Sequence, residues 1–137
     1  MQVVDLDGNS SYWHITGGSA KASRINKSSF HLKARDLIKT IYPTMKVLEE
    51  IPVYIHRSDI AYLDFYIPLI KVCLEVHGEQ HYKFTPFYHV NMMAFLKAQK
   101  RDRDKKEWCS INNIRMIELP YNQLDTWEGL IKDEQNR

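Results

Sequence analysis

The stretch that decides the fold we expect is A-Y-L-D-F-Y-I-P-L-I-K-V-C-L-E-V-H-G-E-Q-H, residues 61–81. It contains two runs of apolar and aromatic residues, 61–67 and 70–77, separated by Pro68-Leu69. Such runs favour two strands with a tight connection between them. Side chains alternate between the faces of a strand. The first run therefore divides into Leu63, Phe65 and Ile67 on one face and Tyr62, Asp64 and Tyr66 on the other.

In the second run the same alternation places Glu75 and His77 on one face, together with Lys71 and Cys73. If the two strands pair as a hairpin, Asp64 approaches Glu75. Two neighbouring carboxylates suit a hard divalent cation, which prefers oxygen ligands, and without a cation their like charges repel. Either acid alone would be interpreted as an ordinary surface residue of a hairpin.

The residues that follow Glu75 favour a functional site over that alternative. They form a polar, titratable cluster in which three histidines lie within thirteen positions. The cluster consists of His77, Glu79, Gln80, His81 and His89. A single histidine is more often structural than catalytic, but a histidine beside paired acids can take a proton from an attacking water.

A long helix is expected from about His89 to Cys109. Helical spacing places Asp102 and Lys105 on one inward face, with Phe95, Ala98 and Cys109. Asp104 falls instead on a solvated face with Lys97, Lys100, Arg101 and Glu107. Asp102 and Lys105 are therefore the pair expected to reach a site. The alternative is a simple i, i+3 ion pair, worth only a few tenths of a kcal/mol.

The rest of the chain predicts a small mixed β-sheet flanked by helices, an α/β (α+β) fold. Around Asp7-Gly8 we expect an N-terminal hairpin, and residues 17–23 read as a linker. Ser28 or Ser29 is expected to cap a helix that ends before Pro43. An edge strand with Pro52, a last strand over 114–119 and a terminal helix around Trp127 complete the order. We divide the chain into a hairpin and linker, 1–23, and a main domain, 24–137.

Composition and charge narrow the class of protein. A chain of 137 residues with 44% hydrophobic residues is long enough for one folded core. It has no apolar run of membrane-spanning length and no signal-peptide pattern at its start. The two cysteines, Cys73 and Cys109, are expected to be reduced core residues, which favours a cytoplasmic protein. The net charge is only +2, but Lys and Arg concentrate in residues 21–39 and 97–106, which permits a polyanionic partner.

Three motifs together resemble the PD-(D/E)xK nuclease superfamily. They are D-F-Y-I-P at 64–68, E-V-H-G-E-Q-H-Y at 75–82 and D-x-x-K at 102–105. Within the superfamily they are most similar to the very-short-patch-repair-like, EDxHD-type branch, which includes phage homing endonucleases. The resemblance covers roughly residues 28–121, and 75–82 is its most specific part. It implies an αβββαβ core of the restriction-endonuclease type and a metal-dependent DNA endonuclease.

The resemblance also implies roles for individual residues. Asp64, Glu75 and the carbonyl of Val76 would bind Mg²⁺, with Mn²⁺ as a substitute. His81 would activate water, supported by Asp102 and Lys105. The superfamily's lysine two positions after the strand acid is His77 here, so either Lys105 or His77 itself would supply the missing group. Accessory candidates are His31, Arg35, Glu49, Glu50, Gln80 and His89.

The expected partner is double-stranded DNA, since phosphodiesters are anions that basic residues attract. The candidate contacts are Lys21, Arg24, Lys27, Lys97, Lys100 and Arg101. A homodimer would help so small a domain to select a site, and the resemblance fits a phage-encoded enzyme acting in host cytoplasm. Three alternatives stay open: a catalytically weak or inactive DNA-binding module, an RNA-directed nuclease, and a structural protein in which the acids and histidines are incidental.

Overall fold

The computed structural model describes residues 1–15 and 28–133. The expected linker and the candidate contacts Lys21, Arg24 and Lys27 lie outside these residues. A four-stranded sheet has the order β3-β4-β5-β6, in which β5 and β6 are parallel and the other pairs are antiparallel. Its strands are β3 (Leu48–His56), β4 (Asp59–Ile67), β5 (Val72–His77) and β6 (Arg115–Pro120). This confirms the expected small mixed sheet.

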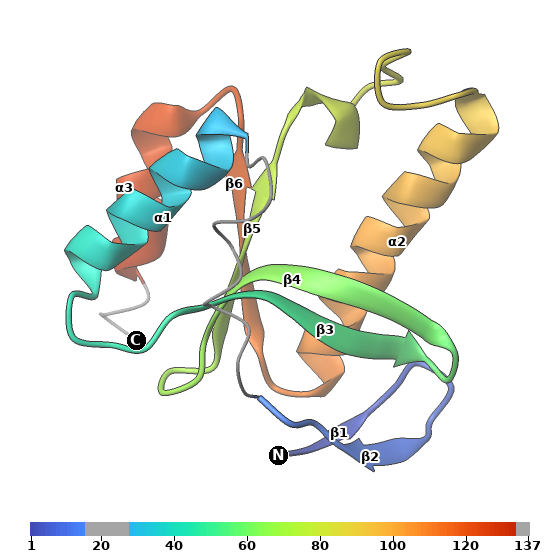
Figure 1. Cartoon of the computed structure of the whole chain (residues 1–137), viewed down its shortest axis with the longest axis horizontal. Helices are drawn as coiled ribbons and strands as arrows, with labels where there is room; N and C mark the ends of the chain where they lie inside the picture. Colours follow the sequence, from blue (N-terminus) through green and yellow to red (C-terminus); the bar gives the residue numbers. More distant parts are fainter. Residues whose placement is uncertain (16–27, 134–137) are drawn as a thin grey trace.

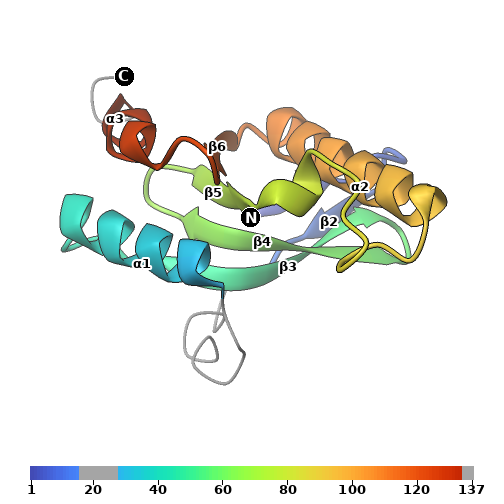
Figure 2. The ribbon, with the colours of Figure 1, turned by 90° about the horizontal axis from the view of Figure 1, so that it is seen from above.

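Helices cover both faces of this sheet (Figures 1 and 2). The helices α1 and α3 lie together on one face, and the long helix α2 lies on the other. The remaining elements are α1 (Ser29–Ile41), the 3₁₀ helices η2 (Glu79–His81) and η3 (Leu124–Thr126), α2 (Met92–Ile111), α3 (Trp127–Lys132), and a hairpin of β1 (Gln2–Val4) and β2 (Ser10–Tyr12). Among the described residues, no helix is long and apolar enough to cross a membrane.

Local sequence signals explain most element boundaries. Ser28 caps α1, accepting a hydrogen bond from His31 N at 3.1 Å, and the helix ends two residues before Pro43. Strand β3, which contains Pro52, is an edge strand as expected. Helix α2 begins at Met92 rather than His89, because residues 85–89 form a turn and Asn91 is the capping residue.

Two buried clusters hold the layers together. Between the sheet and α1 and α3 lie Ala34, Ile38, Phe65, Leu119, Trp127 and Ile131, with others. Between the sheet and α2 lie Ile55, Leu63, Tyr66, Cys73, Trp108 and Cys109, with others. All three tryptophans are buried, and the prediction that both cysteines are core residues is confirmed.

The hairpin β1–β2 belongs to the α2-side cluster. Trp13 packs against Tyr66 and Trp108, with ring centroids 5.0 and 5.2 Å apart. The Asn112 side chain exchanges two hydrogen bonds with the backbone of Val4. Residues 1–15, part of the segment that we separated as 1–23, therefore contribute core side chains to the main domain.

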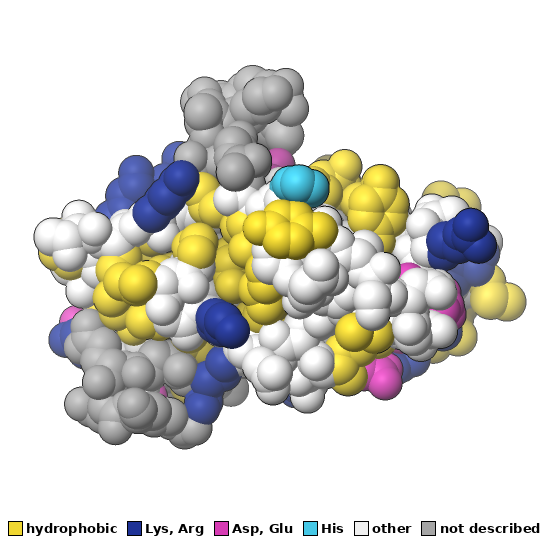
Figure 3. All heavy atoms as spheres, turned by 90° about the horizontal axis from the view of Figure 1, so that it is seen from below, with side chains coloured by type: hydrophobic (Ala, Val, Ile, Leu, Met, Phe, Trp, Pro, Cys, Tyr) yellow, Lys and Arg dark blue, Asp and Glu magenta, His cyan; other side chains and the backbone are white. Residues whose placement is uncertain are grey.

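A hollow of about 390 Å³ lies beside this hairpin, between β2, β3 and β4. Its lining is mostly aromatic and includes Tyr12, Tyr54 and Tyr62, and it contains no carboxylate. On the face seen from below in Figure 3, Lys and Arg side chains (dark blue) are scattered among hydrophobic side chains (yellow). The hollow offers no acidic ligand, so the chemistry expected from the sequence belongs elsewhere.

The expected alternation along β4 is wrong at one point. Leu63 packs on the α2 side, whereas Phe65 packs on the α1 side, and Tyr66 is again on the α2 side. The break falls at Asp64, where the facing residue of β3, Glu50, has a φ of 52°. This left-handed backbone interrupts the pleat, so the strand pair changes the face it presents.

Candidate active site

The sheet opens between β4 and β5 at Asp64 and Glu75. Backbone pairing of the two strands begins at Ile67 and Val72 and ends at Phe65 and Leu74. Beyond that point β5 continues beside β6 as far as His77, and β4 continues beside β3. The two halves of the sheet therefore diverge, as Figure 1 shows, and a cleft of about 550 Å³ lies where they separate.

Side chains replace the missing backbone bonds at this opening. The backbone N–H of Asp64 donates to Glu75 Oε2 at 2.6 Å, and the N–H of Val76 donates to Asp64 Oδ2 at 2.9 Å. The predicted approach of the two acids is thus observed. Because the N–H and C=O of one strand residue point to the same edge, the Val76 carbonyl lies on the edge that faces Asp64. Two carboxylates and this carbonyl can therefore serve as oxygen ligands at the opening, and all three residues line the cleft.

Lys105 reaches the same cleft from α2 and forms an ion pair with Glu75 Oε1. Burial and then repulsion from Asp64 raise the pKa of Glu75 to about 8, against the opposing effect of Lys105. Burial disfavours the charge of Lys105, but the charges of Glu75 and Asp64 outweigh it and raise the pKa of that amine. One cation therefore faces two carboxyl groups, and Glu75 lacks full compensation in the metal-free chain.

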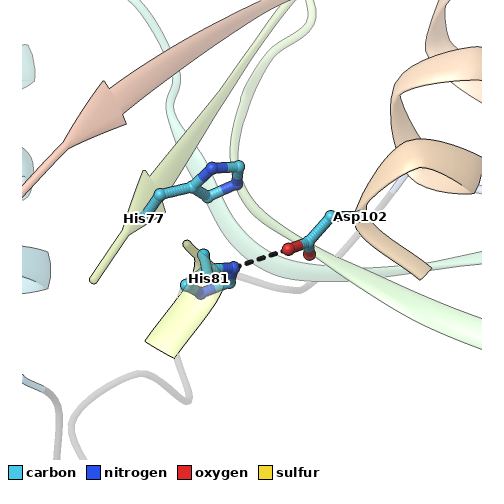
Figure 4. A group of neighbouring side chains, drawn as sticks. All are labelled: His77, His81 and Asp102. Carbon is cyan, nitrogen blue, oxygen red and sulfur yellow. Dashed lines mark hydrogen bonds and ion pairs between the residues drawn. The ribbon is translucent and has the colours of Figure 1, made fainter. Parts of the chain in front are cut away.

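A histidine–aspartate pair lies on the adjoining wall. His81 Nδ1 is 2.7 Å from Asp102 Oδ2, and the rings of His81 and His77 are stacked with centroids 4.4 Å apart (Figure 4). Burial would raise the pKa of Asp102, but the hydrogen bond and charge of His81 hold that pKa below its ordinary value. Ionised Asp102 can only accept, so Nδ1 of His81 donates and Nε2 remains available to accept a proton.

His77 occupies the more buried position of the two histidines. Burial, then the charge of His81, lowers the pKa of His77, so its neutral form is favoured. Its Nδ1 lies 4.0 Å from Glu118 Oε2. His81 and Gln80 line the cleft itself, and Gly78 lets the Gln80 side chain pass close: a Cβ on Gly78 would lie 2.5 Å from Gln80 Oε1.

Helix α1 forms the opposite wall through its first turn. His31 lines the cleft, stacks on Phe65 at 4.5 Å between centroids, and places Nε2 2.8 Å from Glu49 Oε1. Arg35 donates to both oxygens of Glu49, at 3.0 Å for the closer contacts. Of the accessory candidates, His31, Glu50 and Gln80 line the cleft, whereas Arg35 and Glu49 support it from behind.

Other candidate residues lie away from the cleft. His89 is buried between Phe84 and Phe95, and its Nδ1 accepts from the backbone N–H of Thr85 at 3.0 Å. On the exposed side of α2, Lys100 pairs with Asp104 and Arg101 pairs with Asp59. Lys97 is exposed. Two of the three described candidates for DNA contact are therefore already engaged in ion pairs.

The sequence reasoning missed several residues that the structure brings to the site. Glu118 faces Glu75 across the parallel pair of β5 and β6 and approaches His77. The cleft is also lined by Ser28, Ser29 and Phe30. The sequence shows that Glu118 is an acid of the last strand. Its place beside His77 could be predicted only if the register of that strand against β5 were known.

Comparisons with known proteins find viral relatives. The chain is 44% identical over 63 residues to "Uncharacterized protein 307L" of Invertebrate iridescent virus 6, which is 46% of this chain and 32% of that protein. It is 39% identical over 59 residues to "Uncharacterized protein 033L" of Invertebrate iridescent virus 3, 43% of this chain and 30% of the relative. It is 34% identical over 71 residues to "Uncharacterized protein 094L" of Frog virus 3, which is 51% of this chain and 45% of that protein.

These matches each span less than half the length of the viral protein concerned. No family model matches the chain. No solved structure matches it either.

The Glu49 ion pair makes a first testable prediction. Burial opposes the charge of Glu49, but hydrogen bonds from Arg35 and His31 outweigh it and hold the Glu49 pKa below its ordinary value. Arg35→Ala would leave this buried carboxylate with less compensation and is expected to cost about 2 kcal/mol in urea unfolding at pH 7. Glu49 contributes stability above pH 4.5 that is lost as pH falls through its lowered pKa, so the loss should shrink at lower pH. Lys33→Ala, an exposed change on the same helix, is the control.

Proposed function

We propose that the cleft hydrolyses phosphodiester bonds of DNA with the help of a divalent cation, Mg²⁺. The observation that carries this proposal is the opening of the sheet at Asp64 and Glu75. It brings the Asp64 and Glu75 carboxylates together beside Val76, with Lys105 and His81 lining the cleft and Asp102 hydrogen-bonded to His81. Acidic ligands, a cation and an oriented imidazole are the groups that phosphodiester hydrolysis requires.

The residues at the opening fit a hard cation. Asp64, Glu75 and the Val76 carbonyl offer only oxygen donors, which Mg²⁺ prefers. Buried Glu75 has a raised pKa, so its ionised form gains from any further positive charge beside it. A bound Mg²⁺ supplies electrostatic stabilisation of the charge that develops on a phosphodiester.

The other residues act on the water and on the phosphate. Nε2 of His81 accepts the proton of an attacking water, while Asp102 fixes the ring and stabilises the imidazolium that forms. Lys105 favours the ionised form of Glu75 and adds positive charge to the cleft. Gln80, on the remaining wall, has an amide that can donate a hydrogen bond to a phosphate oxygen, whereas Nε2 of His31 is engaged by Glu49.

The DNA substrate rests on the resemblance of the motifs and on charge. Since Lys100 and Arg101 are paired with acids, their contribution to a phosphate-binding surface is reduced. We then expect α2 to make only a few local contacts with the sugar–phosphate backbone of DNA. An inactive DNA-binding module and an RNA-directed nuclease become separate outcomes of the same experiment.

The test is cleavage of supercoiled plasmid by the full chain in Mg²⁺, in Mn²⁺ and in EDTA, with a labelled single-stranded RNA in parallel. We expect nicked or linear plasmid in either metal and none in EDTA. Mg²⁺ should also raise the melting temperature by several degrees, since a ligand that binds only the folded state stabilises it. RNA cleavage alone would move the substrate to RNA. Salt-dependent DNA binding without cleavage would indicate an inactive module. The absence of plasmid cleavage, RNA cleavage, DNA binding and any rise in melting temperature with Mg²⁺ would contradict the proposal.

A further inference from the structure

Beside the oxygen donors of the cleft lies a second group of metal-ligating side chains with different chemistry. His77, His81 and Asp102 each offer one ligand atom, and these atoms all lie within 4.8 Å of one another. Figure 4 shows the three side chains converging from β5, η2 and α2. Within residues 1–15 and 28–133, no other three His, Cys, Asp or Glu side chains lie close enough together to share a metal ion. Neither Asp64 nor Glu75 belongs to the group.

The donor set distinguishes this group from the Mg²⁺ ligands. Two imidazole nitrogens and one carboxylate oxygen suit Zn²⁺ and other late first-row cations, whereas Mg²⁺ prefers oxygen alone. Zinc sites with three protein ligands keep a fourth position open. The side chains of His81 and Asp102 are 26% and 22% exposed, so solvent has access to such a position.

The distances leave a small gap to be closed. Two ligand atoms of a tetrahedral zinc site lie about 3.3 Å apart, because Zn–N bonds are about 2.0–2.1 Å long. His81 Nδ1 and Asp102 Oδ2, now hydrogen-bonded at 2.7 Å, have to separate slightly, and any ligand atoms up to 4.8 Å apart have to approach. Rotation of the partly exposed His81 and Asp102 side chains can supply this change.

The surroundings also favour a cation at this position. The Nδ1 of His77 faces the Glu118 carboxylate at 4.0 Å, an acid placed to orient the ring from outside the ligand set. The rings of His77 and His81 are stacked and nearly parallel, at 6°, so one ring has to tilt before nitrogen atoms of both can bind one cation.

We propose that His77, His81 and Asp102 form a Zn²⁺ site, and that Zn²⁺ bound there inhibits Mg²⁺-dependent cleavage. Inhibition follows because coordination takes His81 and Asp102 out of the pair that handles the proton of the attacking water. The binding half of this inference stands on the ligand geometry alone, whereas the inhibition half rests on the function proposed above.

Binding is tested by titrating ZnCl₂ into the EDTA-stripped, dialysed full chain and recording heat, with Co²⁺ and its visible absorption as a second probe of the ligand set. We expect one Zn²⁺ per chain, undiminished by 10-fold excess Mg²⁺. His77→Gln and Asp102→Asn should each weaken it by about 10-fold or more, and circular dichroism should show both variants folded. His14→Gln, which changes an exposed histidine outside the group, should bind as the wild type does. Absence of saturable binding, or equal binding by His77→Gln, would overturn the site.

Inhibition is tested on the wild type by adding Zn²⁺ to the plasmid assay in constant Mg²⁺. Half-inhibition is expected at the Zn²⁺ concentration that half-fills the site, and excess EDTA followed by Mg²⁺ should restore cleavage. Zinc binding by a chain that never cleaves DNA or RNA would leave the site standing and refute the proposed function. Cleavage that persists with the site full would refute the inhibition.

Discussion

Replacing Asp64 with asparagine is expected to lower Mg²⁺-dependent cleavage by about 100-fold or more while leaving the fold intact. Loss of a carboxylate ligand removes several kcal/mol of charge stabilisation from the transition state, and about 2.7 kcal/mol corresponds to 100-fold. The asparagine oxygen can still accept the hydrogen bond from Val76 N that Asp64 accepts at 2.9 Å. Burial and then repulsion from Asp64 raise the pKa of Glu75, and the substitution removes the repulsion.

This combination of effects separates a ligand from a structural residue. In EDTA, Asp64→Asn should melt at or above the temperature of the wild type, and added Mg²⁺ should no longer raise its melting temperature. The matched control is Asp125→Asn, the same chemical change at an exposed acid of η3. That variant should cut and respond to Mg²⁺ as the wild type does. Cleavage by Asp64→Asn within a few-fold of wild type would remove Asp64 from the metal site.

Much of this arrangement follows from local sequence patterns. The two apolar runs and the connection at Pro68 predict the β4–β5 pair, and the meeting of Asp64 with Glu75 follows from that pairing. Helical spacing correctly turns Asp102 and Lys105 inward. These features depend on residues close in sequence or on one hairpin, where periodicity carries the information.

The remainder depends on contacts that periodicity does not encode. Alternation of side chains assumes an unbroken pleat, so it predicts Leu63 and Phe65 on the same face of the sheet. The left-handed backbone of Glu50 breaks the pleat, and the two side chains lie on different faces. The parallel register of β5 and β6, which brings Glu118 to His77, joins strands separated by the whole of α2. The ion pair between Arg35 and Glu49 likewise joins a helix to a strand. Contacts between elements that are distant in the sequence are the features that sequence patterns predict least well.

Lys105 is the second position at which a substitution should have a large effect, because its ammonium group compensates a carboxylate that is almost fully buried. In the metal-free chain the pKa of Glu75 is about 8, against an ordinary value of 4.5. Between those pH values the folded chain holds a proton that the unfolded chain has released. The stability that Glu75 contributes is therefore fully present below pH 4.5 and is lost as pH rises through 8.

Lys105→Met keeps the aliphatic stem but removes the charge, so ionised Glu75 would be left buried without its cation. In EDTA we expect a loss of about 3 kcal/mol in urea unfolding at pH 9 and a smaller loss at pH 5, where Glu75 is protonated. Glu75→Gln should flatten the dependence of stability on pH, and adding it to Lys105→Met should recover most of the loss at pH 9. Equal losses at pH 5 and pH 9 would show that Lys105 contributes by packing. Cleavage by Lys105→Met should fall by about 100-fold, since electrostatic groups in a water-poor site commonly supply that much.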